Sequence, residues 1–179
     1  METTPETFDV EQQRLREKLE TMFADVHSEL IGTLFYCIGN LDDAHDALQE
    51  TFLKCWKHRE QIDDVQNLRA WVFRIALNTG RDFRKAAWNR RRQPIAEEAL
   101  MVSTAQSPAA RLVRDEQLQT LRCELSKLRD EEREVFLLRQ NGDLTYDQIA
   151  EAMSLPIGTV KTRMRAAIAQ LRLAVGDQS

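Results

Sequence analysis

Three long cationic side chains lie close together near the C-terminal end of the sequence, at Lys161, Arg163 and Arg165. Cations of this length can make bidentate hydrogen bonds to guanine in a major groove, or bind backbone phosphates. On a helix, the inner stripe of this segment would be apolar and consist of Val160, Met164, Ile168 and Leu171. The opposite face would present Gly158, Lys161, Thr162, Arg165 and Ala169, with Thr159 and Arg163 at its edges. The pattern predicts a helix that reads duplex DNA, and a solvated basic helix is the alternative.

The residues before this helix predict its partner. Thr145 and Gln148 have the spacing of a capping box, so a helix should run from Tyr146 to about Met153. The Ser-Leu-Pro sequence of residues 154–156 should end that helix in a tight turn. Two short helices joined in this way are typical of the helix–turn–helix, whose second helix enters the major groove.

A second group of cations precedes the middle of the chain. On an unbroken helix over residues 67–92, about one quarter of the circumference would carry Arg74, Asn78, Arg81, Lys85, Trp88 and Arg92. Cations mixed with an amide and an aromatic ring suit a groove that follows phosphates and stacks bases. This face therefore predicts binding of single-stranded or distorted nucleic acid, provided that Gly80 does not break the helix. Trp71 could belong to the core or to this stacking surface, and the core is the preferred assignment.

An acidic face is expected on the preceding helix, from Leu41 to Trp56. Its buried side would consist of Leu41, Ala44, Leu48, Phe52 and Cys55. The opposite side would carry Asp43, Asp46 and Glu50, with Gln49 at its edge. Carboxylates repel DNA, so this face suits a basic protein surface, and a merely solvated acidic face is the alternative.

Charge is segregated along the 179-residue chain, whose net charge is −4. Residues 65–95 hold eight bases and one acid, and residues 158–179 hold four bases and one acid, whereas the other stretches are acidic. Two basic patches on an acidic body predict two separate contacts with a polyanion.

The pattern of apolar residues predicts an all-α fold with two small helical domains joined by a flexible linker. Residues 8–38, 42–59 and 67–88 have helical periodicity and indicate a first domain of three or four helices within residues 1–92. Residues 93–116 lose that periodicity and contain two prolines, which predicts the linker. Residues 117–179 form the predicted helix–turn–helix domain.

Several other classes of site and location are not expected. The three cysteines, Cys37, Cys55 and Cys123, are isolated and lack histidines at ligand spacing, so no metal site or disulfide framework is predicted. The sequence has no Walker motif, which argues against ATP-driven chemistry, and no cofactor is predicted. No apolar run is long enough to cross a membrane and the first residues do not form a secretory signal, so a cytoplasmic location without membrane insertion is expected.

Three stretches together resemble the extracytoplasmic-function (ECF) sigma factors, the small group of the sigma-70 family. They are LDDAHDALQETFLKCW, NLRAWVFRIALNTGRDFRK and LTYDQIAEAMSLPIGTVKTRMRAA, in this order and at the family's spacing. The resemblance implies a non-enzymatic factor that directs core RNA polymerase to promoters and assists promoter opening. It assigns polymerase binding to Asp43, Asp46, Gln49 and Glu50. It assigns the −10 element to Arg74, Asn78, Arg81, Lys85 and Trp88, and the −35 element to Thr159, Lys161, Thr162, Arg163 and Arg165. It also implies an anti-sigma factor as a partner.

Two other functions are compatible with parts of the sequence. A helix–turn–helix transcriptional regulator that never docks on core polymerase would use the same C-terminal unit. A metal-dependent phosphohydrolase of the HD type would use His45 and Asp46 with His27 upstream and the acids Asp63 and Asp64 downstream. The expected position of Asp46 argues against the phosphohydrolase, because Asp46 should lie on the side of its helix that faces away from the core, where it could not bind a buried metal.

Overall fold

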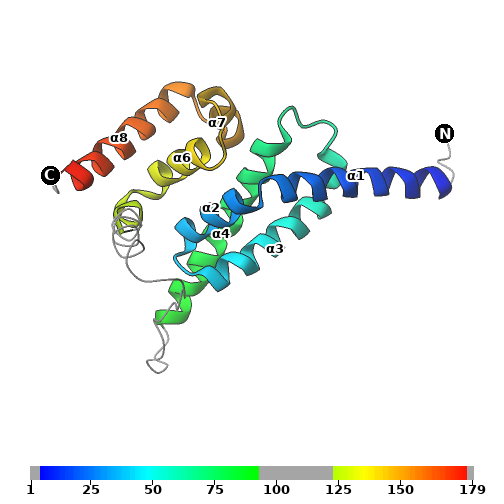
Figure 1. The fold of residues 1–179 in the computed structure, drawn as a ribbon, viewed down its shortest axis with the longest axis horizontal. Coiled ribbons are helices and arrows are strands. Elements are labelled where there is room, and N and C mark those ends of the chain that lie inside the picture. The colour runs from blue at the N-terminus through cyan, green and yellow to red at the C-terminus, as the bar shows by residue number, and fades with distance from the viewer. Residues whose placement is uncertain (1–4, 93–122, 177–179) are drawn as a thin grey trace, which may run out of the picture.

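The computed structural model describes residues 5–92 and 123–176, and every regular element in these two ranges is helical (Figure 1). The first range contains α1 (Pro5–Asp25), α2 (His27–Ile38), α3 (Leu41–Lys57), the short 3-10 helix η1 (Arg59–Gln61) and α4 (Leu68–Arg92). The second contains α6 (Asp130–Gln140), α7 (Tyr146–Met153) and α8 (Ile157–Gly176). The all-α prediction is confirmed. The predicted linker, residues 93–116, lies outside the described residues.

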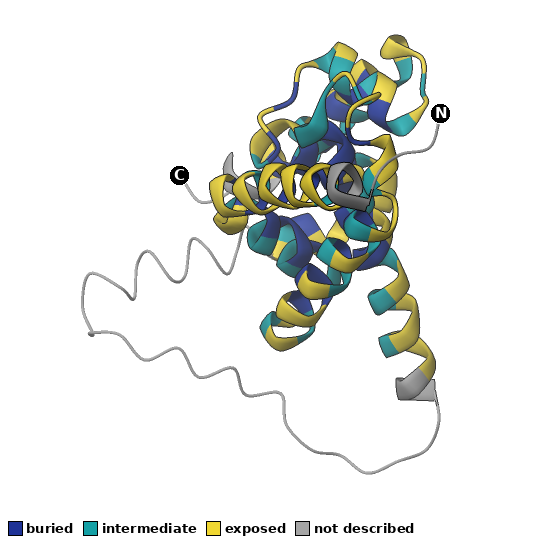
Figure 2. Cartoon of the chain, turned by 90° about the vertical axis from the view of Figure 1, so that its right-hand side faces the viewer, coloured by how far each residue is buried: buried dark blue, intermediate teal, exposed yellow. Residues whose placement is uncertain are grey.

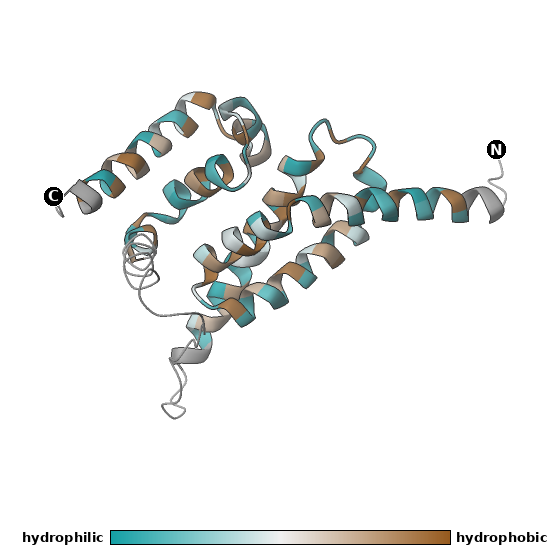
Figure 3. Cartoon of the chain, in the orientation of Figure 1, coloured by the Kyte–Doolittle hydropathy of each residue, from teal (hydrophilic) through white to brown (hydrophobic). Residues whose placement is uncertain are grey.

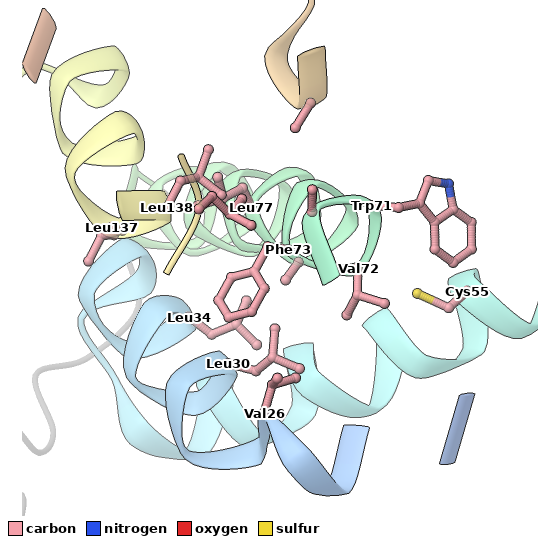
Figure 4. Close-up of a cluster of buried hydrophobic side chains, with 14 of the residues drawn as sticks. Val26, Leu30, Leu34, Cys55, Trp71, Val72, Phe73, Leu77, Leu137 and Leu138 are labelled. Carbon is pink, nitrogen blue, oxygen red and sulfur yellow. The ribbon is translucent and has the colours of Figure 1, made fainter. Parts of the chain in front are cut away.

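The first four helices form a bundle around a shared apolar core. Figure 4 shows Leu30 and Leu34 of α2 beside Phe73 of α4, and none of these three side chains is exposed to solvent. Leu19 of α1 and Ala44 of α3 are equally buried in the same core. Figure 2 shows the buried residues gathered where the helices meet. Burial of these side chains is the main favourable contribution to the free energy of folding.

Local signals in the sequence place the acidic helix. Gly39 ends α2 in the left-handed conformation, with φ +87°. Residues with a side chain rarely adopt this conformation, because Cβ clashes with the backbone, whereas glycine adopts it readily. The side chain of Asn40 then caps α3 by accepting a 3.1 Å hydrogen bond from the backbone amide of Asp43. A two-residue connection therefore reverses the chain and sets α3 against α2.

Gly80 does not break α4, which runs unbroken through the predicted nucleic-acid segment. An added Cβ at Gly80 would lie 3.2 Å from Cβ of Cys37 and 3.4 Å from Cδ2 of Leu34. The missing side chain therefore lets α4 lie close against α2. Trp71 is 6% exposed, so its assignment to the core is confirmed.

The second range forms the expected helix–turn–helix. Thr145 and Gln148 make both hydrogen bonds of the capping box at the start of α7. Ser154 ends α7 in the left-handed conformation, and α8 begins three residues later. Val160 and Met164 of α8 are buried against the preceding helices. Figure 3 shows hydrophobic and hydrophilic residues alternating along α8, as an amphipathic helix requires.

The two described ranges also pack against each other. Helices α6 and α7 contact α4, and α6 contacts α2 (Figure 1). Leu138 of α6 and Leu77 of α4 belong to one apolar cluster (Figure 4). A polar contact joins α2 to the end of α6, where Nδ2 of Asn141 donates a 3.1 Å hydrogen bond to Oγ1 of Thr33. No helix within residues 5–92 and 123–176 is long and apolar enough to cross a membrane.

Candidate nucleic-acid and protein interfaces

The outward face of α8 carries the predicted duplex-reading residues. Lys161, Thr162 and Arg165 are exposed, whereas Thr159 and Arg163 at the edges are half-buried. Thr162 Oγ1 donates a 2.9 Å hydrogen bond to the carbonyl oxygen of Gly158, and Arg165 Nε donates one of 3.3 Å to that of Lys161. The helix thus presents two long cations and a hydroxyl on one side, and the absence of a side chain at Gly158 leaves room for a close approach to DNA.

A groove beside this face contains acids that the sequence reasoning missed. It has a volume of about 540 Å³ and is bounded by the start of α6 and the first turns of α8. Glu131 and Glu132 line it opposite Thr162 and Arg163. Carboxylates near the reading face repel phosphates, so they restrict the path that a DNA backbone can take past α8. Their position depends on how α6 packs on α8, which no local spacing reveals.

Helix α4 brings the second predicted set together along one side. Arg74, Asn78 and Lys85 are exposed, and Trp88 is 60% exposed. Arg81 is half-buried because its guanidinium forms an ion pair with the carboxylate of Glu134 in α6. The remaining Nη1 of Arg81 donates a 2.9 Å hydrogen bond to Oδ1 of Asn78.

This ion pair changes the electrostatics of the α4 face. The hydrogen bond from Arg81 to Glu134 is the main reason why the pKa of Arg81 is raised, so the guanidinium stays charged.

Three side chains of α4, those of Arg74, Asn78 and Arg81, line a cavity of about 460 Å³. Outside α4, its lining comes from Leu138 of α6, from the end of α7, and from His58 and Gln61 after α3. The predicted nucleic-acid face is therefore partly covered in this arrangement of the chain.

The acidic face of α3 points away from the core. Asp46 and Gln49 are exposed, and Asp43 and Glu50 are half-buried. Glu50 Oε1 lies 3.9 Å from Nζ of Lys54, which is a weak surface pair. The face thus keeps most of its negative charge available for a basic partner.

An exposed apolar side chain, Leu53, extends the acidic face of α3. Leu53 is 59% exposed and lies one turn beyond Gln49 and Glu50. Together with Glu50 and Lys57 it lines a groove of about 420 Å³ that reaches Asn78 on α4. A large apolar side chain in a ring of polar residues is typical of a protein-binding surface. The sequence reasoning missed Leu53, although its spacing of seven residues from Asp46 places it on the same side of the helix.

The residues of the alternative metal site do not come together. Within residues 5–92 and 123–176, no three histidine, cysteine or acidic side chains are grouped so that they could hold a metal ion. Asp46 is exposed on the outer face of α3. Burial raises the pKa of the Cys37 and Cys55 thiols to about 12, so both stay protonated at neutral pH and are poor nucleophiles.

Comparison with known proteins connects these surfaces with one family. The sequence model of the Sigma-70 region 2 family matches residues 22–90, which include the acidic face of α3 and most of α4. The model of the Sigma-70 region 4 family matches residues 118–171, which include the helix–turn–helix.

Relatives with assigned functions are similar over most of their length. The RNA polymerase sigma factor YlaC of Bacillus subtilis is 28% identical over 158 residues, which cover 88% of this chain and 91% of that protein. The ECF RNA polymerase sigma factor EcfG of Rhodopseudomonas palustris is 31% identical over 134 residues, covering 74% and 71% of the two chains. The fold is similar to that of the sigma factor RpoE from Bartonella quintana, solved in complex with the anti-sigma factor NepR. That match has a TM-score of 0.68 and 23% identity, and covers 89% of this chain and 98% of the other.

Proposed function

Because the chain belongs to the extracytoplasmic-function sigma factors of the sigma-70 family, we propose that three of its surfaces divide the work of transcription initiation. Sigma factors direct core RNA polymerase to promoters and are not enzymes. The observation that carries the proposal is that one acidic and two basic helix faces are separate on the surface. An acidic surface repels DNA and attracts a basic protein, whereas the two basic surfaces attract DNA.

The outward face of α8 reads the −35 element as a duplex. Lys161 and Arg165 are long enough to reach base edges, and Thr162 adds a hydrogen-bonding hydroxyl. Thr159 and Arg163 flank this face and contact the backbone, because their side chains lie at its edges. Helix α4 binds the −10 element. Arg74, Arg81 and Lys85 contact phosphates, whereas Asn78 contacts a base and Trp88 provides a surface on which a base stacks.

The acidic face of α3 docks on core polymerase. Asp43, Asp46, Gln49 and Glu50 form its polar part, and Leu53 supplies an apolar anchor. A large partner is required on energetic grounds. Opening about ten base pairs costs on the order of 14 kcal/mol, which is comparable to the whole free energy of a tight protein–DNA complex. A chain of 179 residues whose sequence has no Walker motif is not expected to supply this alone.

The remaining parts of the proposal concern location and organisation. The relative RpoE was solved with an anti-sigma factor, and we propose an anti-sigma factor as a partner of this chain too. Promoter binding places the protein in the cytoplasm. The domain boundaries, 1–92 and 117–179 with a linker at 93–116, stay a prediction. Limited proteolysis tests them, and resistance of residues 93–116 to cleavage would contradict the division.

Transcription with purified components tests the function. The full chain is mixed with core polymerase and a library of promoter fragments, and run-off transcripts are selected and sequenced. Core polymerase with this chain should yield promoter-specific transcripts that neither component yields alone. The matched control is a chain with Asp46→Lys and Glu50→Lys, which should fold but dock poorly. A wild-type chain that binds DNA yet neither co-purifies with core polymerase nor directs it would instead be a helix–turn–helix regulator of another kind.

A further inference from the structure

The connection between α3 and α4, residues 58–67, is held by side chains of α1 (Figure 1). Arg14 donates hydrogen bonds from both of its Nη atoms to the carboxylate of Asp63. Lys18, one turn further along α1, donates a 3.1 Å hydrogen bond from Nζ to Oδ1 of the same carboxylate. We call these three side chains the Asp63 cluster. Asp63 thus has two cationic partners that precede it by 49 and 45 positions in the sequence.

Arg59 attaches the connection to α1 at a second point. Its Nε donates to Oε1 of Gln12, and its Nη1 donates a 3.0 Å hydrogen bond to the carbonyl oxygen of Trp56. The guanidinium also lies 4.6 Å from the centre of the Trp56 ring, a distance typical of a cation–π contact. Between the two attachments, Ile62 is 1% exposed and anchors the connection in the core. A network of this kind holds a segment better than one exposed ion pair does.

The other side of the connection borders the proposed strand-binding face of α4. His58 and Gln61 line the 460 Å³ cavity together with Arg74 of α4. Residues 64–67 line a neighbouring groove of about 260 Å³, again together with Arg74. Along the chain, these residues alternate with the two that contact α1. The connection therefore has α1 on one side and the Arg74 end of α4 on the other.

We propose that Arg14 and Lys18 are positioning residues for the −10 strand, which act through Asp63 and do not contact DNA themselves. This inference rests on the proposed role of α4, and it extends the strand-binding apparatus to α1. Without the Asp63 cluster, the connection moves more freely and no longer forms a fixed wall at the Arg74 end of α4. Strand binding then becomes weaker, because a mobile wall must be ordered when the strand binds.

Neutralisation of Asp63 would be a different way for Arg14 to assist strand binding. A free carboxylate close to α4 repels phosphates, and a paired carboxylate repels them less. The two mechanisms differ in the effect of Asp63→Asn. If the cations only neutralised the carboxylate, Asp63→Asn would leave strand binding unchanged or strengthen it. If the cations hold the connection through the carboxylate, Asp63→Asn weakens strand binding, as loss of Arg14 does.

The test compares two arginines of α1 in the full chain. Arg14→Gln removes one partner of Asp63. Arg16→Gln is the matched control, because the Arg16 side chain is similarly exposed, 60% against 54%, and forms its ion pair with Glu20 of its own helix. Both variants lose one positive charge from α1. Asp63→Asn and the double variant Arg14→Gln with Asp63→Asn complete the set, and circular dichroism verifies that each variant is folded.

Two measurements are made on each variant. Hydrogen exchange of the free chain, followed by mass spectrometry at short labelling times, reports opening of the connection. The backbone amides of Gln61, Ile62 and Asp64 donate to carbonyl oxygens within the connection, so their exchange rates depend on how firmly it is held. Fluorescence anisotropy measures how tightly the complex with core polymerase binds a labelled single strand that carries the −10 element of a promoter selected by run-off transcription.

Arg14→Gln and Asp63→Asn should each speed exchange of these amides about two- to fivefold and weaken strand binding by a similar factor, the range that exposed ion pairs support. Arg16→Gln should match wild type in both measurements. The double variant should be no weaker than Asp63→Asn, because both changes break the same contact. Exchange in α2 should stay at the wild-type rate in every variant, because the Asp63 cluster lies outside that helix.

Three results would overturn the inference. The first is equal exchange in Arg14→Gln and Arg16→Gln. The second is strand binding that Asp63→Asn strengthens or leaves unchanged, which would leave neutralisation as the role of Arg14. The third is faster exchange in α2 by the same factor as in the connection, which would show a general loss of stability instead of a local loss of position.

Lys85→Ala separates failure of this inference from failure of the proposed role of α4. Lys85 lies outside the Asp63 cluster, and its loss should weaken strand binding by the polymerase complex. If Lys85→Ala does so while Arg14→Gln speeds exchange without weakening strand binding, α4 binds the strand and the positioning role of α1 is wrong. If Lys85→Ala leaves strand binding unchanged, the role of α4 is wrong and the positioning role is overturned with it.

Discussion

Arg69 and Gly142, which are 73 positions apart in the sequence, are joined by a 2.5 Å hydrogen bond from Nε of the arginine to the glycine carbonyl oxygen. Arg69 Nη2 also donates to the carbonyl oxygen of Asn141, at 3.2 Å. These carbonyls follow the C-terminal end of α6, where helix carbonyls lack partners within the helix and attract cations. The guanidinium of Arg69 in α4 therefore supplies hydrogen bonds to the carbonyl groups that follow the end of α6.

Gly142→Ala should destabilise the protein by about 1–3 kcal/mol, the usual cost of an overpacked site. An added Cβ would lie 2.5 Å from the carbonyl oxygen of Leu138, so the backbone that receives the Arg69 hydrogen bonds must move. Urea unfolding followed by circular dichroism measures the change. Gly158→Ala is the matched control, because nothing lies within 4 Å of its added Cβ and alanine is the better helix former. Equal losses in both variants would contradict the steric explanation.

Acid should weaken the docking of α6 on α4 through Asp130. Burial opposes ionisation of Asp130, but hydrogen bonding and charge from Arg84, with further charge from Arg133, hold its pKa below the ordinary value of 3.8. A carboxyl whose pKa is lowered by folding stabilises the fold above pH 3.8 and loses this contribution as the pH falls toward the lowered pKa. The stability difference between wild type and Asp130→Asn should therefore be constant near neutral pH and shrink below about pH 4.

Asp63→Asn provides a comparison at a site away from α6. Asp63 accepts hydrogen bonds from Arg14 and Lys18, and the first of these is the main reason why its pKa is lowered. Acid should reduce both stability differences, but only Asp130→Asn should alter the radius of gyration at neutral pH. A stability difference for Asp130→Asn that does not vary down to pH 2 would contradict the role of its ionised form.

Asp46→Lys and Leu53→Ala should weaken binding to core polymerase for different reasons. Charge reversal at Asp46 mainly slows association and should matter less at high salt. Loss of the exposed Leu53 side chain should mainly speed dissociation, at a cost above about 1 kcal/mol if it is an anchor. Surface plasmon resonance separates the two rates. Asp25→Lys, an equal charge change at the exposed end of α1, is the control. Unchanged affinity in both α3 variants would mean that this face is only solvated.

Lys85→Ala should reduce promoter opening and make DNA binding less dependent on salt. Each lost phosphate contact lowers the slope of log affinity against log salt by roughly one unit. Permanganate reactivity of unpaired thymines measures opening. Arg16→Ala, on the exposed side of α1 and outside the proposed interfaces, is a matched control for loss of one cation. Permanganate patterns in Lys85→Ala that match wild type at every salt concentration would eliminate the phosphate contact.

Local signals predicted the helices and their outward faces. The capping box at Thr145 and Gln148 and the alternation of buried Val160 and Met164 with exposed Lys161 depend only on neighbours within two turns. Local periodicity also explains why α3 was expected to end at Trp56, one residue before its observed end at Lys57.

Contacts between distant segments could not be predicted in this way. The cations of α4 were expected to be free for nucleic acid, but Arg81 is paired with Glu134, which is 53 positions away. Nothing in the spacing of either helix specifies that they meet, because the interface depends on how α6 and α7 pack on α4. The role of Leu53 could not be predicted for another reason. Periodicity places it on the outer face, but exposed leucines are common, and only the neighbouring groove indicates a protein-binding surface.

Base contacts and phosphate contacts of α8 should be separable by mutation. Arg165→Ala or Lys161→Ala should relax the preference at one or two base pairs of the −35 element, since a bidentate contact to guanine contributes about 1–3 kcal/mol of discrimination. Arg163→Ala should weaken binding about equally on all sequences, because Arg163 lies at the edge of the reading face beside the groove that contains Glu132.

A randomised −35 library, bound by the polymerase complex at one fixed salt concentration, makes this comparison. The three variants are first matched for helix content by circular dichroism, because loss of a long side chain from α8 can lower its helicity. Glu132→Gln provides a further check on geometry: removing a carboxylate opposite Arg163 should strengthen binding on all sequences without changing the preferred one. If the library returns one preference for wild type, Lys161→Ala and Arg165→Ala alike, then α8 binds the duplex without reading it, and the sequence must be recognised elsewhere.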